Sequence, residues 1–143
     1  MKFKFLIVVF CVSIWSCTVD NNNGSQTNYK VEWHLTAVSG GLSGVNETFN
    51  MGSVIWTFNE FTGVLTVVNN NEDTTKEDSY DSGSYPYSIE NLNSKLFLSV
   101  DDIEIGEVTF PSQTQFIIDQ NSTSQGSGAD GYVYKFTKKL VEL

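Results

Sequence analysis

The sequence of 143 residues has no arginine, one histidine, two cysteines and two prolines. Arginine is the side chain that binds phosphate through two parallel hydrogen bonds, and here 17 acidic residues outnumber 8 lysines, for a formal net charge of -9. This balance disfavours nucleic acids and charge-driven docking on an anionic membrane. A single histidine, His34, leaves little room for a histidine-based metal site or catalytic triad. We therefore expect no nucleic-acid partner, no metal ion and no cofactor.

Signals of catalysis are also missing. No Gly-x-Ser-x-Gly pattern of a nucleophile elbow occurs in the sequence. The acidic stretch 119–130 resembles part of a calcium loop by spacing, but it has Ser124 where the turn requires glycine. We expect the protein not to be an enzyme. With 40% hydrophobic and 13% aromatic residues, it has enough apolar material for a folded core.

The one long apolar run lies at the N-terminus. Residues 5–14 are almost uninterrupted apolar residues after Lys2 and Lys4, a length typical of a signal peptide and too short for a membrane-spanning helix. The run ends at Ile14-Trp15-Ser16-Cys17 and a polar segment follows, an arrangement that resembles a bacterial lipoprotein signal. An ordinary secretory signal with an incidental cysteine is the alternative.

The resemblance implies that residues 1–16 are removed and that Cys17 carries acyl chains such as palmitate. Residues 17–28, rich in Asn, Ser and Gly, then form a lipidated flexible tether. We expect a lipid-anchored protein of the outer membrane, either periplasmic or surface-exposed. Because Cys11 leaves with the signal, residues 29–143 contain no thiol for a disulfide and depend on burial for stability.

Residues 29–143 alternate between apolar and polar side chains, the pattern of strands with one buried face. The pattern predicts no helix and eight strands. Pro86 favours an edge or a strand start, and the change of parity across Gly106 predicts a bulge or sharp bend. The expected inward residues are Val31, Trp33, Leu35 and Ala37; Val54, Trp56 and Phe58; Phe61, Gly63, Leu65 and Val67; Tyr85, Tyr87 and Ile89; Leu96, Leu98 and Val100; Ile103, Ile105, Val108 and Phe110; Phe116 and Ile118; Tyr132, Tyr134 and Phe136.

Eight antiparallel strands with one apolar face each can close on themselves or form two packed sheets. Closure removes exposed edges, and consecutive strands mostly pair in space. We therefore predict an all-β fold, an eight-stranded antiparallel up-and-down barrel spanning residues 29–143, with a β-sandwich as the alternative. Polar loops are expected at residues 69–83 and 120–131.

The chain resembles the small lipocalin-like lipoproteins of Bacteroidetes in its lipoprotein leader and in three short patterns. These are Trp33-His34-Leu35, Gly83-Ser84-Tyr85-Pro86-Tyr87 and Leu96-Phe97-Leu98. Lipocalins usually have glycine two residues before the first tryptophan, where this chain has Val31, and a closing arginine that this chain lacks. The resemblance implies a calyx-like barrel that holds a small apolar ligand.

Seven inward aromatic residues are the candidates for a ligand pocket, since binding cavities are mostly apolar. The same residues could simply form the core, and Trp33 is expected to close the barrel floor. Alternation places His34 on the outer, exposed face. The candidates are Trp33, Trp56, Phe58, Tyr85, Tyr87, Tyr134 and Phe136.

Two functions follow from this pattern. The first is binding of a small apolar or amphipathic molecule in the barrel. The second is a non-catalytic envelope interaction module, with a filled barrel that binds a protein or glycan through loops 69–83 and 120–131. A cavity of roughly 300 Å³ or more, open at one end, would favour the first function, and a filled core the second.

Overall fold

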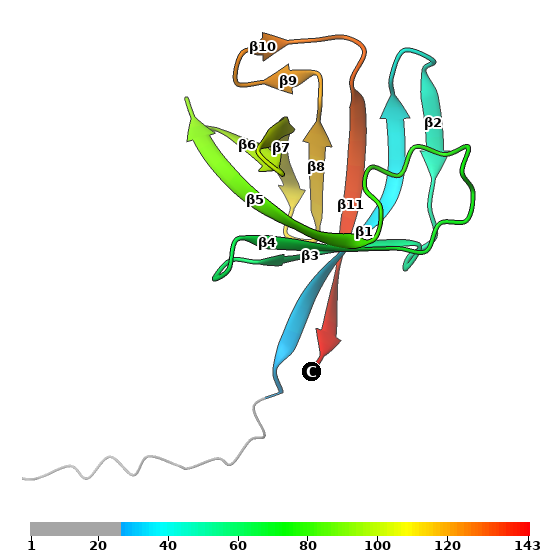
Figure 1. The fold of residues 1–143 in the computed structure, drawn as a ribbon, viewed down its shortest axis with the longest axis vertical. Coiled ribbons are helices and arrows are strands. Elements are labelled where there is room, and N and C mark those ends of the chain that lie inside the picture. The colour runs from blue at the N-terminus through cyan, green and yellow to red at the C-terminus, as the bar shows by residue number, and fades with distance from the viewer. Residues whose placement is uncertain (1–26) are drawn as a thin grey trace, which may run out of the picture.

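The computed structural model describes residues 27–143. The predicted signal peptide 1–16, Cys17 and all but the last two residues of the tether lie outside the described residues. Within residues 27–143 the regular structure is entirely β (Figure 1), and no helix there could cross a membrane. The strands are β1 (Tyr29–Gly40), β2 (Val45–Thr48), β3 (Val54–Asn59), β4 (Val64–Asn69), β5 (Gly83–Leu92), β6 (Lys95–Val100), β7 (Ile103–Ser112), β8 (Gln115–Asp119), β9 (Ser122–Thr123), β10 (Gly126–Ser127) and β11 (Tyr132–Glu142).

Eight of these strands close into an antiparallel barrel. Neighbouring strands pair in the order β11-β8-β7-β6-β5-β4-β3-β1, and β1 also pairs with β11. That last ladder is the longest and runs from Tyr29 opposite Glu142 to Gly40 opposite Tyr132. The predicted up-and-down barrel is confirmed, and the β-sandwich is wrong because β1 and β11 leave no open edge between them. β2 pairs with residues 37–40 of β1, further along the edge that pairs with β3, and β9 and β10 form a small hairpin within the segment that joins β8 to β11.

The first strand departs from simple alternation because it contains a bulge. Leu35 pairs with Phe136 and Ala37 with Lys135, so Thr36 is an extra residue on β1. Beyond the bulge the parity changes, and Val38 rather than Ala37 is fully buried in the core. The expectation of an inward Ala37 was therefore wrong. The Thr36 hydroxyl donates to the carbonyl of Lys135 at 3.0 Å, which ties the bulge to β11.

The predicted bulge at Gly106 is present. Leu98 pairs with Gly106 and Ser99 with Glu104, so Ile105 is the additional residue on β7. Gly106 has φ 139°, and a Cβ on it would lie 2.3 Å from the carbonyl oxygen of Asp119. Only glycine fits this conformation and this close approach to β8.

Pro86 lies inside β5, neither at an edge nor at a strand start as predicted. Its pairing with Val64 is the last between β4 and β5, and pairing with β6 begins at Tyr87. The missing N–H is thus placed where β5 passes from one neighbour to the other, and the Pro86 carbonyl still accepts a hydrogen bond from the Asp101 N–H at 2.9 Å.

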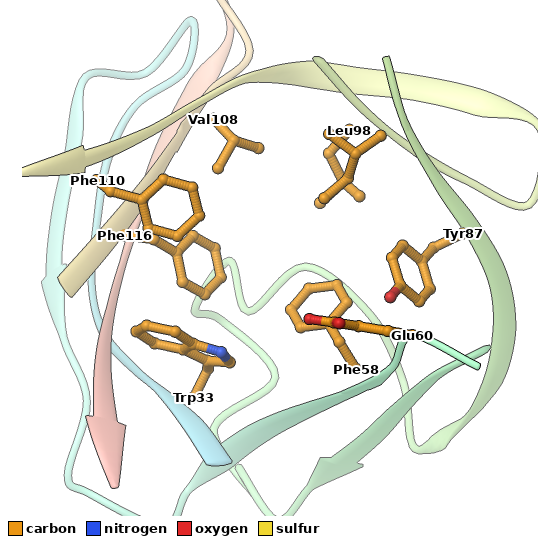
Figure 2. A pocket seen from close by; sticks show the side chains of 9 residues that line it. Trp33, Phe58, Glu60, Tyr87, Leu98, Val108, Phe110 and Phe116 are labelled. Carbon is orange, nitrogen blue, oxygen red and sulfur yellow. The ribbon is translucent and has the colours of Figure 1, made fainter. Parts of the chain in front are cut away.

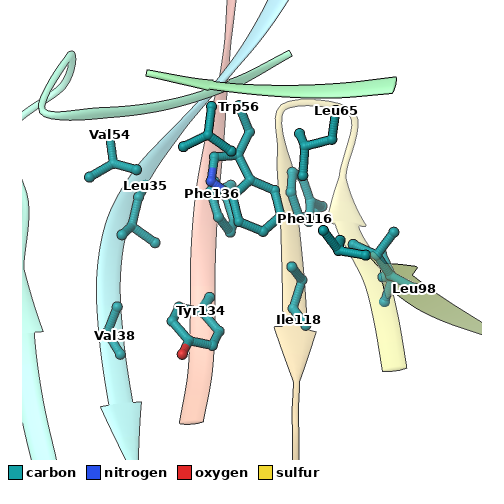
Figure 3. Packing of buried hydrophobic residues seen from close by; sticks show 13 residues of the cluster. Leu35, Val38, Val54, Trp56, Leu65, Leu98, Phe116, Ile118, Tyr134 and Phe136 are labelled. Carbon is teal, nitrogen blue, oxygen red and sulfur yellow. The ribbon is translucent and has the colours of Figure 1, made fainter. Parts of the chain in front are cut away.

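The core follows the predicted inward sets at most positions. Thirteen buried residues form one cluster, to which every barrel strand but β5 contributes (Figure 3): Leu35, Val38, Val54, Trp56, Leu65, Val67, Leu98, Val100, Val108, Phe116, Ile118, Tyr134 and Phe136. Four expected inward residues are exposed instead, among them Phe110 of β7. Phe61 is in the β3–β4 turn, and Ile89 and Ile103 lie where β5 and β7 reach the barrel rim.

Candidate functional site

The two ends of the barrel differ. The terminal end carries Tyr29, Leu143 and the β3–β4, β5–β6 and β7–β8 turns. The loop end carries the β1–β2 turn, the loop of residues 70–82, the β6–β7 turn and the β9–β10 hairpin. This division follows from the antiparallel order, because each strand reverses the direction of the one before it.

A cavity of about 180 Å³ lies inside the barrel at the terminal end (Figure 2). Its wall is almost wholly apolar, and the strands β1, β3, β5, β6, β7 and β8 all contribute to it. The lining residues are Trp33, Phe58, Glu60, Tyr87, Ile89, Leu98, Val108, Phe110 and Phe116.

Two groups of aromatic rings line this cavity, and they meet where the ring centroid of Phe58 lies 6.2 Å from that of Phe116. On one side Trp33 packs edge-on against Phe116, with ring centroids 4.8 Å apart, and Phe110 lies 6.1 Å from Phe116. On the other side Phe58 packs edge-on against Tyr87 at 4.9 Å. Figure 2 shows the space between the groups, with Leu98 and Val108 at its aliphatic end. Because each ring is held by a neighbouring ring, the cavity wall is preformed.

Glu60 and Tyr87 supply the polar groups of the cavity. Glu60 follows β3 directly and is exposed at the mouth, and its carboxylate is directed into the space between the two aromatic groups (Figure 2). Burial raises the pKa of the Tyr87 hydroxyl, and the negative charge of Glu60 raises it further. The phenol is therefore neutral at physiological pH and offers a hydrogen-bond donor next to a carboxylate.

A wider hollow lies outside the cavity at the same end. Trp33, Phe58 and Glu60 line both, and Lys138 lies beside Trp33 with its ammonium nitrogen 5.9 Å from the ring centroid. Lys138 has no ion pair within residues 27–143, whereas Lys30 pairs with Glu32 at 2.8 Å. Trp33 was expected to close the barrel floor; it forms a wall of the open mouth.

The loop end is filled. Tyr80, from the loop of residues 70–82, packs against Trp56 and Tyr85 with ring centroids 5.8 Å and 5.1 Å apart. The Tyr134 hydroxyl donates to Glu77 Oε1 at 2.9 Å and so anchors the same loop to β11. Burial raises the pKa of Tyr134 strongly, and the hydrogen bond to Glu77 adds to the shift. Part of this acidic loop therefore packs on the barrel.

Of the seven predicted ligand-site residues, the cavity brings together Trp33, Phe58 and Tyr87. Trp56, Tyr134 and Phe136 belong to the buried core instead. Tyr85 lies at the loop end, where its hydroxyl donates to the carbonyl of Asp81 at 3.0 Å. Alternation identifies inward side chains but not their level along the barrel axis, so it could not separate these groups.

Sequence reasoning missed the other lining residues as site residues. Five of them were among the predicted inward residues, and the alternation was the signal that could have found them: Ile89, Leu98, Val108, Phe110 and Phe116. Glu60 had no such signal, because it lies in a turn and becomes part of the site only through the closure of the barrel.

His34 is not an exposed surface residue, as alternation suggested. It is 2% exposed, and neither ring nitrogen has a hydrogen-bond partner. Glu32 Oε2 lies 3.3 Å from Nε2, in a geometry outside that of a hydrogen bond. Trp56 Nε1 is likewise buried without a partner, in the middle of the barrel core.

No three His, Cys, Asp or Glu side chains in residues 27–143 converge in a way that could hold a metal ion. Comparison with known proteins found no matching family model, no matching curated protein and no matching solved structure.

Proposed function

We propose that this protein binds a small apolar or amphipathic molecule in the cavity at the terminal end of its barrel, as a lipocalin-like, lipid-anchored protein of the cell envelope. The observation that carries this proposal is the preformed aromatic cavity, which opens at one end of a barrel whose other end is filled. Apolar cavities with a few placed polar groups are the usual form of a small-molecule site.

The volume restricts the ligand. At about 180 Å³ the cavity is smaller than the roughly 300 Å³ named above as favouring ligand binding, the volume at which drug-sized sites begin. It is comparable to an apolar cavity of roughly 150 Å³ that accepts benzene. The proposed ligand therefore places one ring, or a branched group of that size, inside the barrel, and any larger part extends into the hollow beside Trp33 and Lys138.

The proposed anchor enters at the same end of the molecule as the cavity. β1 begins at Tyr29 on the terminal end, so a tether of residues 17–28 joins the barrel beside the mouth. A chain of 12 residues reaches at most about 40 Å. Acylation at Cys17 would thus keep the cavity mouth close to the membrane, within reach of molecules that partition into it.

The alternative, an interaction module that contacts a partner through its loops, has weaker support. Tyr80 and Glu77 are engaged with the barrel, which leaves less of the acidic loop to contact a partner. The observation in favour of this alternative is that the loop-end half of the barrel is filled.

The full-length protein, purified in mild detergent, tests the proposal by native mass spectrometry and by an NMR titration with 2-phenylethanol, a neutral molecule with one ring. We expect saturable shifts at Trp33, Phe58 and Phe116. Val108→Phe, which places a ring in the cavity, should abolish them. Val68→Phe is the matched control, because Val68 is exposed on the outer face of β4.

Phe110→Ala provides a second variant at a half-exposed position on the cavity wall, where truncation costs less stability than in the buried core. It should weaken binding of 2-phenylethanol several-fold, since one aromatic wall is lost. If wild type, Val108→Phe and Val68→Phe give the same shifts, the cavity is not a binding site and the proposal is wrong.

A further inference from the structure

The cavity contains one charged side chain among apolar ones. Glu60 is fixed at the mouth by the β3–β4 turn, in which the Asn59 side chain accepts hydrogen bonds from the N–H groups of Phe61 and Thr62, each at 3.1 Å. Within residues 27–143 the Glu60 carboxylate has no ion pair. A carboxylate that points into a ligand cavity and is not neutralised by the protein is available to a ligand.

The aromatic walls favour the same sign of charge in the ligand. The faces of aromatic rings carry negative potential and attract cations positioned within about 6 Å of the ring centre. Five of the nine lining residues are aromatic, and they stand on both sides of the space that the Glu60 carboxylate enters (Figure 2). The net charge of -9 further raises the local concentration of cations around the protein.

The lysines at this end, Lys30 and Lys138, line the outer hollow, which Glu60 also lines, and neither lines the cavity. Lys138 lies beside Trp33, whereas the cavity itself has no lysine in its wall. The interior therefore has an acceptor carboxylate, the Tyr87 hydroxyl and aromatic faces, but no positive charge.

From this arrangement we infer that the ligand is a small organic cation: an amine whose aromatic or branched apolar body fills the cavity, and whose ammonium group lies between Glu60 and Tyr87 at the mouth. This inference deepens the proposed function and rests on it. The apolar body would contact Leu98, Val108 and Phe116, and the ammonium would donate hydrogen bonds to the Glu60 carboxylate.

Desolvation explains why a cation is preferred over a neutral or anionic ligand. A neutral apolar ligand at the mouth takes water from the Glu60 carboxylate and returns no hydrogen bond, which costs free energy. An anion adds like-charge repulsion to that cost. An ammonium group replaces the lost water with a charge-assisted hydrogen bond.

Three probes of nearly the same shape separate these cases: 2-phenylethylamine, 2-phenylethanol and phenylacetate. Their affinities for the full-length protein are measured by NMR titration at neutral pH. We expect the amine to bind about tenfold tighter than the alcohol, the low end of what a hydrogen bond to a charged group contributes. Phenylacetate should bind more weakly than either.

Glu60→Gln removes the charge and keeps the shape of the side chain. Because Glu60 is exposed, we expect the variant to fold, and its thermal midpoint checks this. The variant should remove the preference for the amine over the alcohol, so that the two bind with similar affinity. Glu72→Gln is the matched control, since it removes one exposed negative charge from the loop of residues 70–82 at the opposite end. Added salt should weaken binding of the amine in wild type but not in Glu60→Gln.

The outcomes distinguish the inference from the proposed function. If amine and alcohol bind equally to wild type and Glu60→Gln, the cavity takes neutral ligands, so the inference fails and the proposed function stands. If none of the probes binds, both fail. If phenylacetate binds tightest and Lys138→Gln removes that preference, the site recognises anions at the outer hollow and the inference is overturned.

Discussion

Ile117 and Ile118 are consecutive residues of β8 that face opposite sides of the barrel wall. Ile118 is fully buried in the core cluster, between Val108 of β7 and Tyr134 of β11, whereas Ile117 is only half-buried. Ile118→Ala should therefore lower the free energy of unfolding by about 2–5 kcal/mol, and Ile117→Ala by less than half as much. Urea denaturation of the two variants measures the difference; equal losses would contradict the assigned inner face of β8.

The buried hydroxyl of Tyr134 makes the stability of the fold depend on pH. Its pKa lies above the ordinary value near 10, because burial disfavours the phenolate and Glu77 accepts the hydroxyl proton in a hydrogen bond. The unfolded chain loses this proton near pH 10 while the folded chain keeps it. The resulting stabilisation is complete below pH 10 and falls as the pH rises above it.

Unfolding by urea at a series of pH values around and above 10 checks this expectation. The free energy of unfolding should fall more steeply with pH in wild type than in Tyr134→Phe, which has no hydroxyl to titrate. Parallel curves for the two proteins would show that Tyr134 titrates normally. Tyr80 and Tyr87, whose pKa values are also raised by burial, remain in both proteins and contribute equally to both curves.

At the scale of the element, the bend in β7 depends on Gly106. Gly106 and Gly126 have similar backbone angles, φ 139° and φ 145°, but only Gly106 lies against another strand. A Cβ at Gly106 would be 2.3 Å from the Asp119 carbonyl oxygen, whereas nothing lies within 4 Å of a Cβ at Gly126. Gly126→Ala should thus show the cost of backbone strain alone, about 1 kcal/mol, and Gly106→Ala about 2–4 kcal/mol more.

Thermal or urea unfolding of the two glycine variants tests this difference. If Gly106→Ala loses no more free energy of unfolding than Gly126→Ala, then β7 and β8 can move apart without cost. The close approach at the bend would then not be needed for the stability of the barrel. The sequence predicted this bend correctly, because the inward parity changes across Gly106. It did not predict the bulge at Thr36, where the inward position moves from Ala37 to Val38 without a glycine to mark the change.

For the whole molecule, the prediction is membrane attachment through Cys17. Labelled palmitate should be incorporated into the wild-type protein when it is expressed in a bacterial host, and Cys17→Ala should incorporate none. Cys11→Ala is the matched control, since Cys11 lies within the predicted signal peptide. Equal labelling of wild type and Cys17→Ala would exclude lipidation at Cys17.

Local residue patterns were enough to predict the strands and, at most positions, their inner faces. Alternation is a local property, fixed by the pleat of each strand, and it can be read without knowing what a strand pairs with. It therefore predicted an eight-stranded barrel and most of the core, including Trp56, Leu65, Ile118 and Phe136.

Which aromatic residues line a cavity and which fill the core depends on how distant segments of the chain come together. Closure joins β1 to β11, about a hundred residues apart in the chain, and the register of that ladder sets the level of every side chain along the barrel axis. In the folded barrel the turn residue Glu60 lines the cavity, and Tyr80 packs against Trp56. His34 of β1 is buried, where alternation predicted exposure. These positions depend on contacts between distant segments, and no local pattern encodes them.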